Sequence, residues 1–299
     1  MLRLFGCNIC RFKPTKRFLI RKLQNEVKLL KGALDITRMP PATGWLRDIQ
    51  LANFAIMKEV VRFCDERGMR YWMSEGTLLG AVRHGGFIPW DDDIDLAMSR
   101  DDFDRFVSEF NRSGHARLYA KYDGDNNHHL IKVYHKTIPY LFVDIFVYDF
   151  YYGRLDGWDA RCELTKQIKE KQRKIKTPPD AEACRLYYKN WRDTELCGAD
   201  EESFDGKPII YRGLDYLSSP DRSIFYDYDD FFPLRKLKFE GMEFAAPRRP
   251  YVYLTCCYGD YMTFPDKRYG GYHTEVHSMS LAEVMAIKAW LEEMGMCDL

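Results

Sequence analysis

One acidic stretch constrains this chain more than any other, because apolar residues enclose it on both sides. Residues 75–98 read EGTLLGAVRHGGFIPWDDDIDLAM, with four aspartates within residues 91–95. Side chains alternate between the two faces of a strand, so Asp93 and Asp95 are expected on one face and Ile94 on the other, in a core. Two neighbouring carboxylates repel each other unless a cation lies between them. Their hard oxygen ligands suit Mg²⁺ or Mn²⁺.

A later aspartate completes a candidate metal site. Asp144 lies in the apolar segment LFVDIFVYDF, where an aspartate is costly to bury without a charge partner. If its strand lies beside the acidic one, three carboxylates converge, and such a group suits phosphoryl transfer. Two carboxylates would hold the metal that neutralises a pyrophosphate, and the third can accept a proton from an attacking hydroxyl. Gly76-Thr77 would bring the N–H groups of a helix N-terminus near the phosphates.

Hydrophobic periodicity predicts how these segments are arranged. Apolar residues spaced by three and four predict a core-facing helix over 45–67, followed by a strand at 69–74 and a short helix at 77–84. Capping boxes predict helix starts at Ser99, with Asp102, and at Ser280, with Glu283. The remaining expectations are paired strands at 130–135 and 140–150, two helices within 156–198 with a solvated basic face at 161–176, a hairpin at 237–245, a helix at 251–258, and loops at 124–129 and 199–230.

Composition excludes some classes of protein. Lys plus Arg equals Asp plus Glu, at 45 each, so bulk charge indicates no partner, and a nucleic-acid partner is not expected. No apolar run approaches the roughly 20 residues of a membrane span, and the N-terminus lacks the apolar region of a secretory signal. Nine scattered cysteines favour a reduced, cytoplasmic protein. A four-thiolate zinc site from Cys7, Cys10, Cys256 and Cys257 is an alternative to plain thiols, although its spacing departs from the usual pattern.

The N-terminus is strongly basic. Residues 1–31 carry nine Lys or Arg and one acid, Glu26. Residues 15–31 are predicted to form a basic helix, either solvated or lying on an anionic membrane surface. Pro40-Pro41 then breaks the chain. We therefore expect a basic helical segment at 1–40 and the main domain at 41–299.

Four segments also resemble the LicD/fukutin-related phosphotransferase family. They are GTLLGAVRHGGFIPWDDDIDLAM at 76–98, VDIF at 143–146, FPLRKLKFEGMEFAAP at 232–247 and YGDYM at 258–262. They match the family in order over about residues 70–270. The resemblance implies a nucleotidyltransferase-like mixed sheet with flanking helices, an α/β (α+β) fold, and a helical insertion at about 151–231. Gly76-Thr77, Asp93, Asp95 and Asp144 match the superfamily's Gly-Ser/Thr turn, its DxD strand and its third carboxylate.

The same resemblance implies an activity. Family members transfer a phospho-alcohol, such as phosphocholine or a phosphopolyol, from a CDP-activated donor to a sugar hydroxyl of a surface glycan or its lipid-linked precursor. This implies a cytoplasmic enzyme that acts at the inner membrane surface. Asp93 and Asp95 become ligands of Mg²⁺ or Mn²⁺, Asp144 a third ligand or the general base, and Asp91 an assisting residue, whereas Asp92 is expected to face elsewhere. Expected donor-binding residues are Gly76, Thr77, Arg83, His84 and Lys132, and expected acceptor-side residues are His273 and His277.

Plainer interpretations remain open at this point. Arg83 and His84 also suit a solvated helix end, Lys132 an exposed strand position, and the two later histidines a surface loop. An enzyme that attaches NMP to a small molecule or protein would need the same carboxylates, and an inactive glycan-binding or scaffold protein is an alternative of another class. An EF-hand is excluded, because the acidic stretch lacks the required glycine and the final glutamate.

Overall fold

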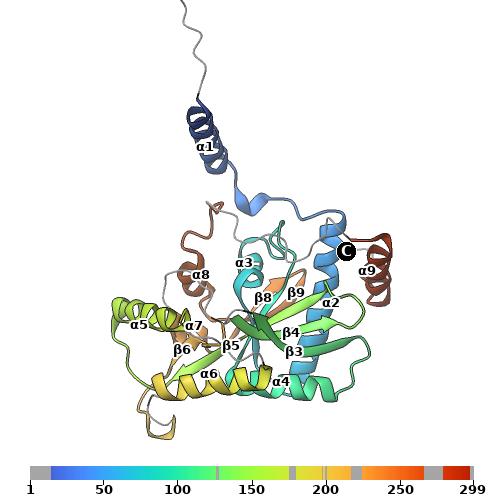
Figure 1. The fold of residues 1–299 in the computed structure, drawn as a ribbon. Helices are drawn as coiled ribbons and strands as arrows, with labels where there is room; N and C mark the ends of the chain where they lie inside the picture. The colour runs from blue at the N-terminus through green and yellow to red at the C-terminus, as the bar shows by residue number, and fades with distance from the viewer. Residues whose placement is uncertain are drawn as a thin grey trace, which may run out of the picture.

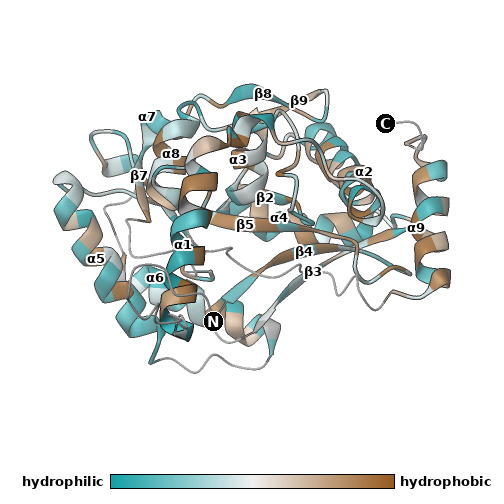
Figure 2. Cartoon of the chain, turned by 90° about the horizontal axis from the view of Figure 1, so that it is seen from above, coloured by the Kyte–Doolittle hydropathy of each residue, from teal (hydrophilic) through white to brown (hydrophobic). Residues whose placement is uncertain are grey.

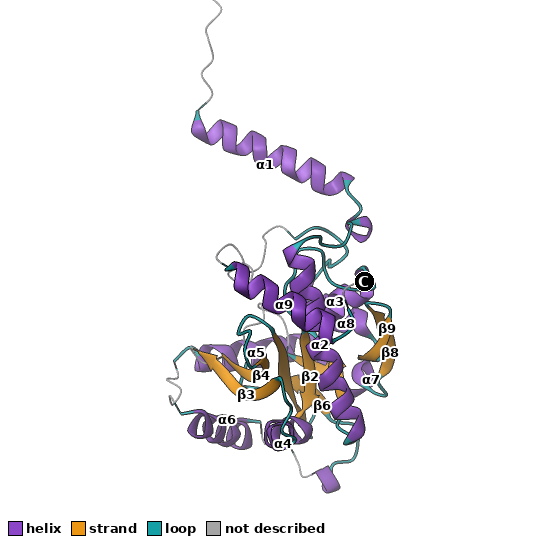
Figure 3. Cartoon of the chain, turned by 90° about the vertical axis from the view of Figure 1, so that its right-hand side faces the viewer, coloured by secondary structure: helices purple, strands orange, loops and turns teal. Residues whose placement is uncertain are grey.

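A mixed sheet lies at the centre of the molecule with helices on both faces, and one helix extends away from the body (Figures 1 and 3). The computed structural model describes residues 15–125, 128–174, 180–196, 198, 201–216, 224–265 and 279–296. This architecture confirms the expected α/β (α+β) class with a mixed sheet and flanking helices.

The helices within these residues are α1 Lys16–Ala33, α2 Trp45–Glu66, α3 Glu75–Arg83, α4 Arg100–Arg112, α5 Gly157–Gln172, α6 Ala181–Glu195, α7 Tyr228–Phe231, α8 Pro250–Tyr258 and α9 Leu281–Glu293, with the 3-10 helices η1 Ile36–Arg38 and η2 Glu201–Ser203. The strands are β1 Tyr71–Met73, β2 Asp95–Ser99, β3 Leu118–Asp125, β4 His128–His135, β5 Phe142–Tyr151, β6 Ile209–Arg212, β7 Phe225–Asp227, β8 Arg235–Phe239 and β9 Met242–Ala246.

Strand β5 organises the sheet. Its sequence is almost continuously apolar, as expected for a strand covered on both faces, and Figure 2 shows it as a brown band through the molecule. β2 runs parallel along one edge of β5, with Asp95 paired to Asp144. Along the other edge, β4 and then β6 pair antiparallel with successive parts of β5. β1, β3 and β7 continue the sheet outward, while β8 and β9 form a separate hairpin.

Alternation along β5 sends its side chains into two different helical layers. Tyr148 faces α8, where its ring lies near Tyr253, whereas the next residue, Asp149, faces the start of α4. Helices α2 and α4 meet through aromatic contacts, with the Phe63 ring 5.0 Å from that of Phe110. Asp144 has the same parity as Tyr148 and therefore lies on the α3 and α8 side.

A buried ion network joins the chain after β5 to the sheet. The Arg100 guanidinium donates to both carboxylate oxygens of Asp149, at 2.9 and 2.8 Å, and to Asp215 at 2.6 and 3.3 Å. Arg192 on α6 donates to Asp149 at 3.1 Å, and the Tyr122 hydroxyl donates to Asp215 at 2.8 Å. Burial alone would raise the pKa of Asp215, but the charge and hydrogen bonds of Arg100 hold it below its usual value.

Several sequence expectations are confirmed and others are wrong. The helices at 45–67 and 251–258, the 237–245 hairpin and the capping box at Ser280 are present. The 199–230 region was expected to be a loop, but β6 and β7 lie within it, because Ile209–Arg212 completes the outer edge of β5. Residues 124–129 fall largely within the β3–β4 hairpin instead of a long loop.

The capping box expected at Ser99 is also absent. The Ser99 hydroxyl donates to the Asp102 carboxylate at 3.1 Å, and that carboxylate also accepts the Arg70 N–H at 3.1 Å. The Asp102 side chain therefore connects α4 to the start of β1 instead of closing the helix on itself.

Candidate active site

Three aspartates converge at the beginning of the two parallel strands. Asp95 is the first residue of β2 and lies beside Asp144 on β5, while Asp93 precedes β2 by two residues. One carboxylate oxygen from each residue lies within 4.8 Å of the other two, and all three side chains are buried. Oxygen ligands at this spacing fit a hard divalent cation such as Mg²⁺ or Mn²⁺. The predicted convergence is therefore present in the fold.

The aspartate run itself forms a second group. Oxygens from Asp91, Asp92 and Asp93 also lie within 4.8 Å of one another. Asp92 was expected to face elsewhere, and it does stand outside the group that Asp93 forms with Asp95 and Asp144, although it is buried beside Asp91 and Asp93. Because β2 begins only at Asp95, residues 91–94 are not extended in the sheet and need not alternate.

Electrostatics make this cluster unfavourable without a cation. Burial raises the pKa of Asp95 well above its usual value, and the charges of Asp93 and Asp144 raise it further. Lys132 on β4 is the register partner of Asp144, and its ammonium donates to both oxygens of Asp144 at 2.6 and 2.9 Å. One lysine therefore faces a group of carboxylates that would otherwise repel one another.

The start of α3 orients Asp95. The Gly76 N–H donates to Asp95 Oδ2 at 2.9 Å, and the Thr77 hydroxyl accepts the Asp95 N–H at 2.8 Å. A Cβ at Gly76 would lie 2.7 Å from Asp91 Oδ2 and 3.3 Å from Asp95 Oδ2, so a larger residue here would have to displace these carboxylates. Gly76 and Thr77 thus contact a candidate metal ligand directly, and their expected role toward donor phosphates remains a prediction.

Two buried amide side chains of α2 bond the backbone of the acidic loop, residues 84–94 between α3 and β2. Gln50 donates to the Asp91 carbonyl at 2.8 Å and to the Ile88 carbonyl at 3.3 Å. Asn53 donates to the Asp92 carbonyl at 2.8 Å and accepts the Phe142 N–H at 3.0 Å. Two polar residues on the buried side of a helix therefore bond the backbone of the loop and of β5 at once.

The β8–β9 hairpin holds the same loop from another side. Glu240 accepts the Phe87 N–H at 3.0 Å, pairs with Arg47 at 2.6 Å, and donates its own N–H to the Gly85 carbonyl at 3.0 Å. Glu240 therefore ties the β8–β9 hairpin to the segment that leads into the aspartates.

A buried acid–base cluster adjoins the aspartates. Glu75 has a φ of 37°, and its carboxylate accepts from Arg212, from the Tyr253 hydroxyl at 2.5 Å and from the Tyr258 hydroxyl at 3.3 Å. Burial alone would lower the pKa of Arg212, but Glu75 raises it well above its usual value. Sequence reasoning missed this cluster, although the lone arginine in the apolar run IIYRGL was a usable signal.

The other predicted residues are arranged as follows. Arg83 donates to the Tyr261 carbonyl at 2.8 Å, and burial lowers its pKa to about 10, against an opposing effect of Asp91. The His84 Nε2 lies 3.0 Å from the Ile36 carbonyl of η1, and burial lowers its pKa. These contacts hold neighbouring segments, and a role in binding the donor remains a prediction. His273 and His277, like Cys7 and Cys10, lie outside the described residues.

Comparisons with known proteins identify similar sequences. Residues 68–178 match the family model described as LicD/FKTN/FKRP, nucleotidyltransferase domain. The chain is similar to the lipopolysaccharide cholinephosphotransferase LicD of Haemophilus influenzae, with 26% identity over 263 residues, 74% of this chain and 92% of that protein. A shorter stretch of 43 residues is 51% identical to ribitol 5-phosphate transferase FKRP of Mus musculus and of Homo sapiens, covering 14% of this chain and 9% of each relative.

Proposed function

Because this chain carries a nucleotidyltransferase domain of the LicD/FKTN/FKRP family, we propose that it transfers a phospho-alcohol to a sugar hydroxyl of a glycan. The donor is a CDP-alcohol, the acceptor a cell-surface glycan or its lipid-linked precursor, and the reaction depends on Mg²⁺ or Mn²⁺. Two relatives support this class of reaction, since one is named a cholinephosphotransferase and the other a ribitol 5-phosphate transferase. The observation that carries the proposal is the approach of Asp93, Asp95 and Asp144 to within 4.8 Å.

The chain supplies the groups that this reaction requires. Asp93 and Asp95 would hold the cation, which when bound supplies positive charge to the donor pyrophosphate, and Asp144 lies beside them as the general base. The Gly76 N–H and the Thr77 hydroxyl keep Asp95 in place. Lys132 donates to both oxygens of Asp144 at 2.6 and 2.9 Å and so holds this carboxylate in position.

The bonds exchanged are those of an in-line displacement at phosphorus. The acceptor hydroxyl oxygen forms a bond to the phosphorus that carries the alcohol, and the bond from that phosphorus to the CMP oxygen breaks. CMP leaves with the electron pair, and Asp144 takes the proton of the attacking hydroxyl.

Release of CMP tests the proposal. The protein is incubated with CDP-choline, CDP-ribitol and CDP-glycerol in Mg²⁺ or Mn²⁺, with and without a glycan acceptor. Asp93→Asn and Asp95→Asn should each lower CMP release at least about 100-fold, since a metal supplies several kcal/mol of charge stabilisation. Asp101→Asn is the matched control, because Asp101 is exposed on α4.

The products separate the alternatives. Turnover by Asp95→Asn near that of the unsubstituted protein would contradict the assignment of a metal ligand. Nucleotide attached to the acceptor with release of pyrophosphate would instead establish NMP transfer. Failure to bind Mn²⁺ in the presence of every donor would favour an inactive binding protein.

A further inference from the structure

Helix α1 presents an apolar stripe that nothing in the described part of the chain covers. The helix projects from the body (Figure 3), and its residues step by three and four along one side. Each residue of this stripe is between 46% and 62% exposed. Five large apolar residues that share one face are rarely this exposed in a soluble protein. The stripe consists of Ile20, Leu23, Val27 and Leu30 on α1 and of Leu34, which directly follows the helix.

The charge of α1 is equally one-sided. Residues 16–33 hold six basic residues and one acid, Glu26, which gives a net charge of +5. Glu26 pairs with Lys22 at 3.7 Å, and both side chains are more than half exposed. An exposed apolar stripe on a strongly basic helix is the pattern of helices that lie in the interface of anionic membranes.

A second copy of α1 matches the stripe less well. The stripe spans about two heptads, whereas a stable coiled coil sustains at least three or four. Two such helices would also bring like net charges together. Phosphate headgroups oppose the basic residues, and acyl chains accept the apolar ones. We therefore propose that α1 binds an anionic lipid surface, with the stripe turned into the bilayer interface.

The base of α1 is tied to the helix that orients the candidate site. Ile36 in η1 is buried, and its carbonyl lies 3.0 Å from His84 Nε2 at the end of α3. Lys31 on α1 donates to the Pro265 carbonyl. A lipid surface bound by α1 would therefore lie near the helix whose other end contacts Asp95. This placement, which rests on the proposed function, suits an acceptor that a lipid anchors in the membrane.

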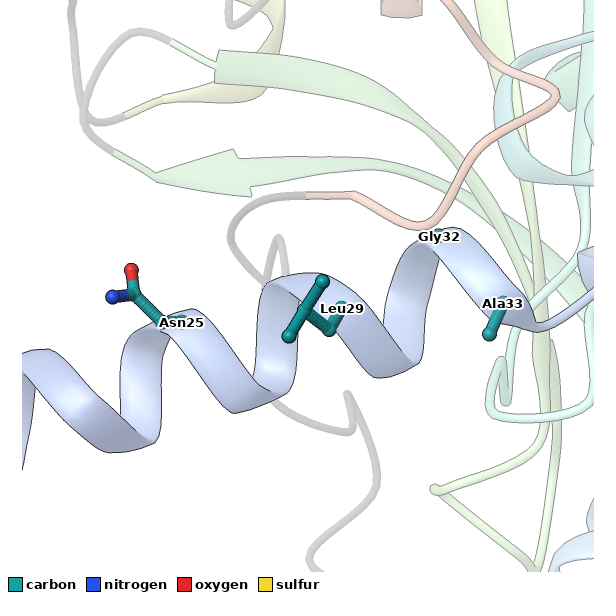
Figure 4. Close-up of a pocket in the computed structure, with 4 residues that line it drawn as sticks. All are labelled: Asn25, Leu29, Gly32 and Ala33. Atoms are coloured by element: carbon teal, nitrogen blue, oxygen red, sulfur yellow. The ribbon is translucent and has the colours of Figure 1, made fainter.

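The opposite side of α1 provides a matched control. A hollow beside the helix is lined by Asn25, Leu29, Gly32 and Ala33 (Figure 4). At 100° per residue, Leu29 lies at least about 100° around the helix from every member of the stripe. Leu29 is 74% exposed, more than any stripe residue, so its substitution changes at least as much exposed apolar area as that of Leu23 or Leu30 alone, without touching the stripe.

Co-sedimentation of the full-length protein with vesicles tests the proposal. Phosphatidylcholine vesicles that contain phosphatidylglycerol should bind the protein, less at high salt, whereas phosphatidylcholine alone should bind it weakly. The double variant Leu23→Ser/Leu30→Ser should lower binding at least about tenfold, while Leu29→Ser should bind like the unsubstituted protein. Circular dichroism verifies that the variants are folded.

Three results would overturn the proposal. They are binding that does not depend on phosphatidylglycerol, a double variant that binds as well as the unsubstituted protein, and a dimer in sedimentation equilibrium that the double variant abolishes. The last result would make the stripe a protein interface. Because vesicle binding needs no CDP-alcohol, its failure is distinct from failure of the proposed transfer.

Discussion

Replacing Asp95 with asparagine should stabilise the metal-free protein while it removes the activity. The substitution keeps the shape of the side chain, and the asparagine carbonyl can still accept the Gly76 N–H that now bonds Asp95 at 2.9 Å. It removes one negative charge from a buried group that also contains Asp93 and Asp144. A residue kept for metal binding at the expense of stability is expected at an active site.

The size of this gain follows from the spacing of the carboxylates. Two unit charges 4.8 Å apart repel each other by about 3.5 kcal/mol at an effective dielectric constant of about 20. Lys132 neutralises part of this charge through Asp144, and the raised pKa of Asp95 shows that protonation relieves another part. We expect a net gain of about 1–2 kcal/mol, which corresponds to roughly 2–6 °C in Tm for a domain of this size.

Asp215 provides the control with the opposite sign. It is fully buried and receives two hydrogen bonds from Arg100 and one from Tyr122. Asp215→Asn leaves Arg100 with Asp149 as its remaining carboxylate partner in this network. Breaking a buried pair in this way should cost about 2–4 kcal/mol. The same chemical change therefore raises Tm at one buried aspartate and lowers it at the other.

Thermal unfolding with EDTA and with Mn²⁺ measures both effects. In EDTA, Asp95→Asn should unfold above the unsubstituted protein and Asp215→Asn below it. Mn²⁺ should raise the Tm of the unsubstituted protein and of Asp215→Asn by mass action, but raise that of Asp95→Asn much less. A lower Tm for Asp95→Asn in EDTA, or an undiminished Mn²⁺ shift, would refute this reasoning.

Three further predictions concern the support of the site and the ion network. Gly80→Ala should cost about 2 kcal/mol or more and weaken Mn²⁺ binding, because its Cβ would lie 2.4 Å from the Gly86 carbonyl oxygen. Gly32→Ala on α1 is the control, because its Cβ would meet no atom within 4 Å, and equal effects of the two substitutions in urea unfolding would contradict this prediction. Arg212→Met should lower the free energy of unfolding by about 3–5 kcal/mol, because it leaves Glu75 without its buried cation. Adding Glu75→Gln should restore much of this stability, and additive losses in the double-variant cycle would show that the pair is not coupled. The pKa of Asp215 is lowered on folding, so the stability that its carboxylate contributes is present above about pH 4 and is lost as the pH falls. The difference in unfolding free energy between Asp215→Asn and the unsubstituted protein, measured in urea, should therefore shrink toward pH 3. A difference that stays constant with pH would contradict this linkage.

Sequence reasoning identified the parts of the site that depend on local pattern. Asp93 and Asp95 flank a buried isoleucine, and Asp144 stands alone in an apolar strand, so burial itself indicated a shared cation. The sequence did not show that the strands of Asp95 and Asp144 are neighbours. The parallel pairing of β2 with β5, which places Asp95 beside Asp144, confirms this assumption.

The missed parts depend on contacts between residues far apart in the chain. Gln50 and Asn53 resemble ordinary polar positions on a helix until the loop that they bond is placed beside them. Arg212 belongs to a segment whose strand character appears only when β5 offers an open edge. No periodicity within a single segment encodes such contacts.

The contacts that hold the acidic loop determine how much of the chain a folded fragment must include. Residues 68–178 contain every candidate metal ligand, yet Gln50 and Asn53 precede that region, and Glu240 and Tyr253 follow it. A fragment confined to residues 68–178 would therefore keep the ligands but lose the groups that hold their backbone. A fragment needs to run from the start of α2 to the end of α8 if its carboxylates are to be positioned before a metal ion binds.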